Sequence, residues 1–266
     1  MSSTPQVLPD GALVGMVHLL PLPGSPGATA SLHETVTRAV EDARTLARAG
    51  FDALMMENFG DAPFRATQVE PHTVASMTVV GRAIREAVPL PLGINVLRND
   101  PLAAMAVAAA CGAAFIRVNV HVGVYATDQG LIEGRADETL RYRRQLGIDV
   151  AIFADVHVKH AQPLSSPDIA EAAEETAYRG RADGLIVSGT ATGKPTSLDD
   201  LARVRSAVPD RPILVGSGAT PETVRSLLDV ASGVIVGTAV KHRQRTTAPV
   251  DPESAAAMVR AAREPR

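Results

Sequence analysis

The sequence predicts a parallel (β/α)8 barrel, and three observations carry this prediction. Short apolar runs alternate with longer amphipathic runs, and they do so eight times along 266 residues. Such regular alternation is typical of βαβ units and a parallel sheet. The length is one that α/β barrels use as a single domain. Because no gap remains for a second domain, we expect residues 1–266 to form one closed barrel; an open doubly wound sheet is the alternative.

The expected elements follow from this alternation. Eight Val-, Ile-, Leu- and Ala-rich segments are the predicted strands: Leu13–His18, Ala53–Glu57, Leu92–Val96, Phe115–Val120, Val150–Asp155, Gly184–Ser188, Ile213–Gly216 and Gly233–Gly237. Helices are expected near 31–49, 70–88, 101–112, 136–146, 168–180, 198–208, 220–230 and 251–263. Asp100–Pro101 and Thr220–Pro221 each place an N-cap residue before a proline at the first helical position.

Composition excludes several classes of protein. Hydrophobic residues make up 45% of the chain and aromatic residues 3%, so the core is expected to be aliphatic. The net charge is −3 with no run of like charges, which argues against a nucleic-acid partner. A lone cysteine, Cys111, excludes an intramolecular disulfide. No apolar run reaches the roughly 18 residues of a membrane span, and no signal pattern opens the chain. We therefore expect a cytoplasmic protein with no membrane partner; homo-oligomers stay open.

The longest connections all follow predicted strands. They are Leu19–Ala30, Phe59–Val69, His121–Arg135 and Lys159–Pro167, with a shorter Gly-rich one at Gly189–Pro195. In a barrel such loops gather at the carboxyl ends of the strands, where these enzymes carry their chemistry. We expect them to be binding loops, the alternative being plain surface connections.

Two glycine motifs predict a phosphate site after the last two strands. Gly216, Ser217 and Gly218 follow the seventh strand, and Gly237 and Thr238 follow the eighth. Glycines let the backbone approach an anion closely, and exposed amides at a helix start carry partial positive charge. The pairing is similar to the closing half of phosphate-binding barrels such as the tryptophan synthase α-subunit. Turn glycines without a ligand are the alternative.

A second Gly-rich loop, Ser188–Pro195, follows the sixth strand. Its spacing departs from the P-loop pattern, so we reject a nucleoside triphosphatase. Small residues and a lysine could still contact a phosphate or ribose from the other side, which makes Ser188, Gly189, Thr190 and Lys194 candidates for binding.

Polar side chains are expected to point into the barrel. Side chains alternate along a strand between the interior and the helix layer. The positions near the strand ends that should face inward are polar, with Asp155 and His157 inward or at the rim: His18, Glu57, Asn95, Arg117, Asn119, His121, Asp155, His157 and Ser188. Buried charge is costly unless paired, so a barrel built for stability alone would fill these positions with aliphatic residues.

Arg117 stays charged and must find a carboxylate, with Glu57 and Asp155 as the obvious partners. We expect Glu57 and Asp155 to be a general acid–base pair, because perturbed titratable groups cluster where chemistry happens. Arg117 and Asn119 join them as catalytic candidates, and His18, His121 and His157 are the alternates. A purely structural ion-pair network is the competing interpretation.

No cofactor is predicted, although a divalent metal held by Glu57, Asp155 and His157 is a minority alternative. The first strand lacks H-x-H and the eighth lacks a terminal acid, which argues against an amidohydrolase-type centre. Lys159 lies just beyond the fifth strand. Contact with a substrate anion is favoured for it over an imine-forming role, and a solvated lysine at the rim is an equally open alternative.

Four segments carry a resemblance to a known family. Gly15–Gly24, Met56–Phe64, Ala154–Ala161 and Gly189–Lys194 together resemble the BtpA/SgcQ family, in order and across almost the whole chain. The resemblance implies a TIM-barrel fold and leaves the reaction poorly defined. One branch of the family is tied to photosystem I biogenesis, and another sits beside sugar-metabolism genes.

Two classes of function follow. The first is an enzyme that cleaves or isomerises a phosphorylated sugar or a ribosyl, nucleoside-type compound by acid–base chemistry, as a lyase, a glycosidic-bond hydrolase or an isomerase. Its phosphate site, with Asn95 and Lys159 among the binding residues, would orient the reacting carbon over Glu57 and Asp155. The second is a non-catalytic assembly factor or metabolite sensor. Buried ionisable groups favour the enzyme.

Overall fold

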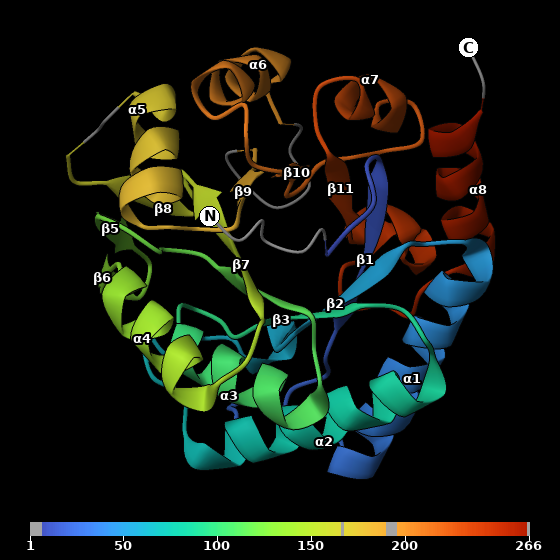
Figure 1. Cartoon of the computed structure of the whole chain (residues 1–266). Coiled ribbons are helices and arrows are strands. Elements are labelled where there is room, and N and C mark those ends of the chain that lie inside the picture. The colour runs from blue at the N-terminus through green and yellow to red at the C-terminus, as the bar shows by residue number, and fades with distance from the viewer. Residues whose placement is uncertain (1–6, 166–167, 190–195, 265–266) are drawn as a thin grey trace.

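Eight parallel strands close into a barrel that helices surround, which confirms the predicted fold (Figure 1). The computed structural model describes residues 7–165, 168–189 and 196–264. The barrel strands are β1 (Ala12–His18), β2 (Ala53–Glu57), β3 (Leu92–Asn95), β4 (Phe115–Val118), β7 (Ala151–Val156), β9 (Gly184–Val187), β10 (Ile213–Val215) and β11 (Gly233–Val236). The sheet closes because β1 pairs with both β2 and β11.

The helices lie between the strands as expected. They are α1 (Leu32–Ala49), α2 (Pro71–Ala87), α3 (Pro101–Cys111), α4 (Ala136–Leu146), α5 (Ile169–Glu174), α6 (Leu198–Ala207), α7 (Val224–Leu228) and α8 (Pro252–Arg263). A π-helical turn continues α5 over Glu175–Arg179. In the part of the chain described, no helix is long and apolar enough to cross a membrane.

One predicted N-cap is confirmed and the other is wrong. The Asp100 carboxylate accepts a hydrogen bond from the Ala103 amide at 2.9 Å and so caps α3. Thr220 does not cap α7. Its carbonyl accepts hydrogen bonds from the amides of Thr223 and Val224, so Pro221 lies in a turn and the helix begins at Val224. The prediction failed because Pro at position two of a turn and Pro at the first helical position share one sequence pattern.

Side-chain alternation separates two apolar layers. The larger cluster packs the outer face of the strands against the helices. The smaller cluster fills the barrel interior: Leu8, Ala12, Val14, Met16, Ala53, Met55, Phe115, Ala151, Phe153, Ile186, Leu214 and Ile235. The rings of Phe115 and Phe153 meet edge to face at 5.5 Å between centroids. They fit because Gly93 and Gly184 face them, where a Cβ would lie 2.2 and 2.4 Å from the rings.

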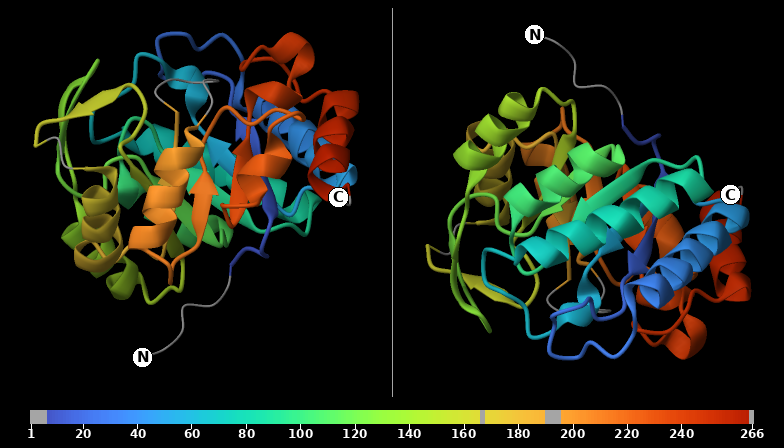
Figure 2. Two further views of the ribbon diagram at one scale, coloured as in Figure 1. Left: turned by 90° about the horizontal axis from the view of Figure 1, so that it is seen from above. Right: turned by 90° about the horizontal axis from the view of Figure 1, so that it is seen from below.

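A small antiparallel sheet stands beside the barrel, at a place where the sequence predicted only loops. It consists of β5 (Val124–Thr127), β6 (Gly130–Glu133) and β8 (Ala161–Pro163), in the order β6-β5-β8. Figure 2 shows it at the end of the barrel opposite residues 7–11. Its inner side chains Tyr125 and Ile132 pack with Val120 and Val158, which follow β4 and β7. The sheet therefore holds the loops that leave these two strands.

A buried ion pair joins helix α1, near the start of the chain, to the segment between β11 and α8. The Lys241 ammonium donates to the Asp42 carboxylate at 3.0 Å, and both side chains are buried. Asp42 also accepts the Val250 amide at 2.7 Å, and Arg38 lies 3.3 Å from it. The contact joins α1 to the segment before α8.

Replacing Asp42 by Asn should destabilise the protein by about 3–5 kcal/mol, because the Lys241 charge would stay buried without its counterion. The amide keeps an acceptor for Val250. The matched control is Glu86→Gln, whose partner Arg82 is exposed, as is Glu86 itself; that change should cost less than about 1 kcal/mol. Urea unfolding of both variants measures the difference. Equal losses would contradict the structural role of the Lys241 pair.

Candidate functional site

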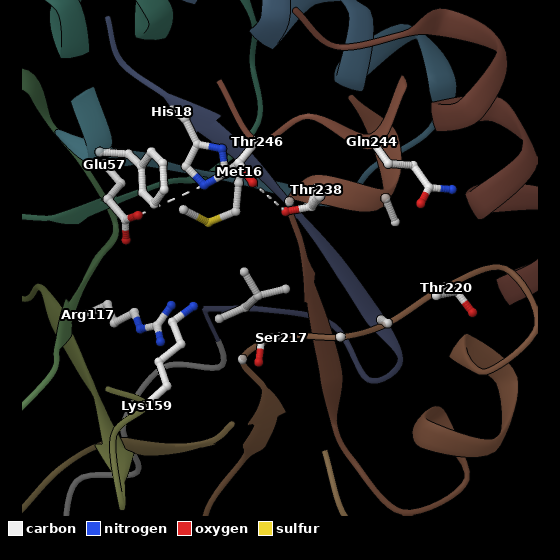
Figure 3. A pocket seen from close by; sticks show the side chains of 17 residues that line it. Met16, His18, Glu57, Arg117, Lys159, Ser217, Thr220, Thr238, Gln244 and Thr246 are labelled. Atoms are coloured by element: carbon white, nitrogen blue, oxygen red, sulfur yellow. Dashed lines mark hydrogen bonds and ion pairs between the residues drawn. The ribbon is translucent and has the colours of Figure 1, made fainter. Parts of the chain in front are cut away.

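A cavity opens at the carboxyl ends of the barrel strands, the end at which the sequence placed the chemistry (Figure 3). It encloses about 110 Å³. Strands β1, β2, β4 and β11 contribute its walls, together with the loops after β2, β7, β10 and β11. The polar side chains lining it include His18, Glu57, Arg117, Lys159, Ser217 and Thr238.

Arg117 and Asp155 form a bidentate ion pair inside the barrel. The Arg117 Nε and Nη2 atoms donate to the two Asp155 oxygens, each at 2.8 Å, and both side chains are almost fully buried. Asn119 donates to the same carboxylate at 3.1 Å, and Ser188 at 3.2 Å. Asn95 extends the network by donating to the Asn119 side chain at 3.0 Å. The predicted inward placement and pairing of Arg117 are confirmed.

This network changes the expected role of Asp155. Its two oxygens accept four hydrogen bonds, two of them from the Arg117 guanidinium. A carboxylate in this position orients the guanidinium. Of the two carboxyl groups expected to act as an acid–base pair, Glu57 lines the cavity and Asp155 does not.

Glu57 ends β2 and faces the cavity almost completely buried. In the part of the chain that the structure describes, no hydrogen bond reaches its carboxyl group, and His18 Nε2 lies 3.9 Å from Glu57 Oε1. Burial raises the pKa of Glu57 above its ordinary value, although the charges of Arg117 and Lys159 oppose the shift. The cavity thus holds a carboxyl group whose protonated form is favoured by its surroundings.

His18 ends β1 beside Glu57 and contacts the Phe59 ring, with 4.9 Å between centroids. Burial lowers the pKa of His18 well below its ordinary value, and the positive charges of Lys241 and Lys159 add to this effect. The imidazole is therefore neutral. Its contact with Glu57 is not an ion pair, and it can serve as a hydrogen-bonding wall of the cavity.

Lys159 reaches the cavity from the loop after β7, and its side chain points toward the Arg117 guanidinium (Figure 3). Its backbone carbonyl accepts a hydrogen bond from Arg98 Nη2 at 2.6 Å. Burial lowers the pKa of Lys159, and the neighbouring Arg117 lowers it further. The cavity thus brings together a cation, a protonatable carboxyl group and an amine.

The glycine motifs after β10 and β11 line the opposite wall of the cavity. Gly218 has a φ of 77°, a conformation that glycine adopts without strain. Within residues 7–165, 168–189 and 196–264, no acceptor takes the amides of Gly218 and Ala219. Beyond β11, Gly237 precedes a short 3-10 turn at Thr238–Val240, and Thr238 Oγ1 lies 2.9 Å from Thr246 Oγ1. Two glycine turns side by side, the first with unbonded amides, suit an anion.

The two Gly-rich loops also contact each other. A Cβ on Gly216 would lie 2.2 Å from Ser188 Oγ, the hydroxyl that bonds Asp155. The Gly189 amide donates to Ser217 Oγ at 3.3 Å. Ser188 and Gly189 thus support the cavity from behind. Thr190 and Lys194, the other two candidates of this loop, lie outside the described residues.

The structure gathers most of the predicted residues and leaves some apart. The cavity is lined by His18, Glu57, Arg117, Lys159, Gly216, Ser217, Gly218, Gly237 and Thr238. Asn95, Asn119 and Asp155 lie behind that wall. His157 does not line the cavity, and the His121 ring bonds the Gly180 carbonyl at 2.8 Å instead. His121 lies three residues beyond the end of β4, and the backbone leaves the extended conformation at His157, whose φ is 51°, so the alternation does not reach either ring.

The three residues of the alternative metal site, Glu57, Asp155 and His157, do not come together around one point. Asp155 is occupied by Arg117, and His157 lies outside the cavity wall. Across the described ranges, no group of three His, Cys, Asp or Glu side chains is arranged to hold a metal ion.

Sequence reasoning missed several residues of the site. Phe59, Gln244 and Thr246 line the cavity, and Arg98 holds the Lys159 loop. Phe59 stands in the segment after Glu57 and could have been found there. Gln244 and Thr246 lie between β11 and α8, in a stretch without strand or helix periodicity, so no pattern marked them.

Two polar residues after Glu57 shape the loop rather than the cavity. Asn58 Oδ1 accepts the Leu97 amide at 2.7 Å, and Asp61 Oδ1 accepts the Leu22 amide at 2.8 Å. The Asn58 amide also donates to Asp61 at 3.0 Å. These bonds fasten the loops after β1, β2 and β3 to one another.

Comparison with known proteins agrees with the resemblance seen in the sequence. The family model described as "BtpA family" matches residues 10–264. The "Photosystem I biogenesis protein BtpA" of Synechocystis is 47% identical over 252 residues, which cover 95% of this chain and 88% of that protein.

Two solved structures show the fold relationship. Phosphoribosyl anthranilate isomerase from Thermus thermophilus superposes with a TM-score of 0.58 at 13% identity, covering 94% of this chain and 97% of that one. Tryptophan synthase from M. tuberculosis gives 0.59 at 16% identity, covering 96% and 94%. At these identities the similarity shows the shared barrel fold alone.

Replacing Arg117 by Leu should cost about 3–5 kcal/mol in the free energy of unfolding, because Asp155 would be left as an uncompensated buried charge. Adding Asp155→Asn to that variant removes the charge and should recover part of the loss. A double-mutant cycle by urea unfolding measures the coupling. If the loss in the double variant equals the sum of the losses in Arg117→Leu and Asp155→Asn, the pairing is contradicted.

Replacing Glu57 by Gln should change the pH dependence of stability in a defined direction. The fold raises the pKa of Glu57. The protonated carboxyl group therefore contributes to the stability of the parent at low pH, and this stability is lost as pH rises through the raised pKa. Glutamine does not titrate. The melting temperature of Glu57→Gln relative to the parent should therefore increase between about pH 4 and 8, as thermal scans would record. A constant difference across that range would show that Glu57 is ordinarily ionised in the fold.

Proposed function

The chain belongs to the BtpA family, and from the geometry of its cavity we propose that it is an enzyme converting a small phosphorylated sugar or ribosyl compound by proton transfer. One observation carries the proposal. Among the described residues Glu57 is a buried carboxyl group without a hydrogen-bond partner, and it faces the same cavity as the glycine turns after β10 and β11, where the amides of Gly218 and Ala219 have no acceptor in the described ranges. A barrel that needed only stability would keep neither feature.

The substrate's phosphate is assigned to the turns after β10 and β11. The amides of Gly218 and Ala219 and the hydroxyl of Thr238 are the donors, and the glycines allow close approach. Because this wall lies across the cavity from Glu57, a bound phosphate would direct the rest of a small molecule toward the carboxyl group. The volume of about 110 Å³ favours a small substrate over a dinucleotide.

Glu57 is assigned the proton transfer. It can donate a proton to a leaving or carbonyl oxygen and accept one from carbon or water, since burial raises its pKa. Arg117 is fixed by Asp155 at the cavity wall and would stabilise negative charge that develops on the substrate. Asp155, Asn119 and Ser188 position this guanidinium. Whether the bond broken is C–C, C–O or C–N depends on the substrate.

A second function has an observation in its favour. A relative 47% identical to this chain carries the name of a photosystem I biogenesis protein. The same cavity could then bind a phosphorylated metabolite as a signal for an assembly factor that performs no catalysis. Turnover separates the two functions, since both require ligand binding.

The test measures binding and turnover separately. Inorganic phosphate and a panel of sugar and ribosyl phosphates should raise the melting temperature of the parent, and one of them should be converted. Glu57→Gln should lower turnover by roughly 10²–10⁴-fold while phosphate binding persists, since other residues supply the phosphate site. The surface variant Glu86→Gln is the control and should match the parent. Binding without any conversion would favour the sensor, and full turnover in Glu57→Gln would refute the catalytic assignment.

A further inference from the structure

The chain has three lysines, and two of them are described in very different surroundings. Lys241 is buried and paired with Asp42 at 3.0 Å. Lys159 projects into the cavity, and among the described residues no carboxylate lies within ion-pair distance of its amine. A largely enclosed ammonium without a counterion is unfavourable, so its retention calls for a reason other than stability.

The geometry points to Lys159 as a nucleophile that forms an imine with the carbonyl carbon of a phosphorylated aldehyde or ketone. This inference rests on the proposed function and narrows its substrate class. The amine, the Glu57 carboxyl group and the glycine turns line one small cavity. A molecule that carries both a phosphate and a carbonyl group would contact all three.

The surroundings of Lys159 prepare it for this role. Val158 is buried against the small β5-β6-β8 sheet, and Arg98 bonds the Lys159 carbonyl at 2.6 Å, so the backbone is held on both sides. The charges around the amine are Arg117, Glu57, Asp155 and Arg98. Asp155 is engaged by Arg117 and cannot pair with the amine. Burial and Arg117 lower the pKa of Lys159, which raises the fraction of neutral, nucleophilic amine.

The step balances with groups already in the cavity. The Lys159 nitrogen lone pair attacks the carbonyl carbon, and the carbonyl oxygen takes a proton from that nitrogen to become a hydroxyl group. Glu57 gives its proton to that hydroxyl group, which leaves as water while nitrogen and carbon form the double bond. The products are a protonated imine, one water and the Glu57 carboxylate. That carboxylate is then a base for the carbon next to the imine, or for a hydroxyl group whose deprotonation cleaves a C–C bond.

Reductive trapping tests the inference on the full chain. The parent is incubated with dihydroxyacetone phosphate, glyceraldehyde 3-phosphate or ribose 5-phosphate and reduced with sodium borohydride. At least one probe should leave a stable adduct that peptide mass spectrometry places on Lys159. Inorganic phosphate should suppress the adduct, and unphosphorylated dihydroxyacetone should give less of it. Glu57→Gln should slow trapping by about 100-fold.

Variants of Lys159 distinguish a nucleophile from a simple cation. Lys159→Arg keeps the charge and should abolish trapping while inorganic phosphate still raises the melting temperature. Lys159→Met should also abolish trapping, and a retained rise of its melting temperature with inorganic phosphate would show that the chain folds without the amine. In every variant Lys194, Lys241 and the N-terminal amine serve as internal controls for random modification.

Three outcomes would overturn the inference. Adducts spread equally over the control amines would show unspecific reaction. Adducts absent from Lys159, with the phosphates binding and being converted, would refute the imine and leave the proposed function standing. Absence of any phosphate binding would remove the inference together with the proposed function.

Discussion

A closed barrel can hold the Arg117 guanidinium in its interior because Asp155 meets it with two parallel hydrogen bonds of 2.8 Å. The other groups at this end of the barrel depend on that contact. Asn119, Ser188 and, through Asn119, Asn95 are arranged around the carboxylate, so β3, β4 and β7 and the loop after β9 share one polar network. Because the Arg117 guanidinium and the Asp155 carboxylate pair with each other, Glu57 and Lys159 are left to interact with a ligand in the cavity.

Much of the fold was predictable because the barrel is encoded locally. Each strand is a short aliphatic run followed by an amphipathic helix, and alternation along the strands correctly directed Arg117 and Asp155 inward. The β5-β6-β8 sheet was not predictable in this way. Its strands are three or four residues long, and β8 lies far along the chain from β5. The Lys241–Asp42 pair joins positions 199 residues apart, a contact on which local patterns carry no information.

The site was predicted in position and only partly in chemistry. The glycine turns after β10 and β11 line one cavity together with His18, Glu57 and Arg117, as their spacing indicated. The state of each carboxyl group was not accessible, because it depends on neighbours: Asp155 has four donors, and Glu57 has none among the described residues. His121 and His157 do not line the cavity, because His121 lies three residues beyond β4 and the backbone turns at His157, whose φ is 51°.

The packing beneath the cavity determines the path by which a ligand can enter and leave. Phe115 and Phe153 meet across the barrel opposite Gly93 and Gly184, and Leu8 and Ala12 belong to the same apolar plug. The barrel axis is therefore solid, not a tunnel. A ligand that enters at the carboxyl ends of the strands has to leave through the same opening. Departing and arriving molecules would compete for one entrance, and residence in the cavity would be governed by the loops around it rather than by the barrel wall.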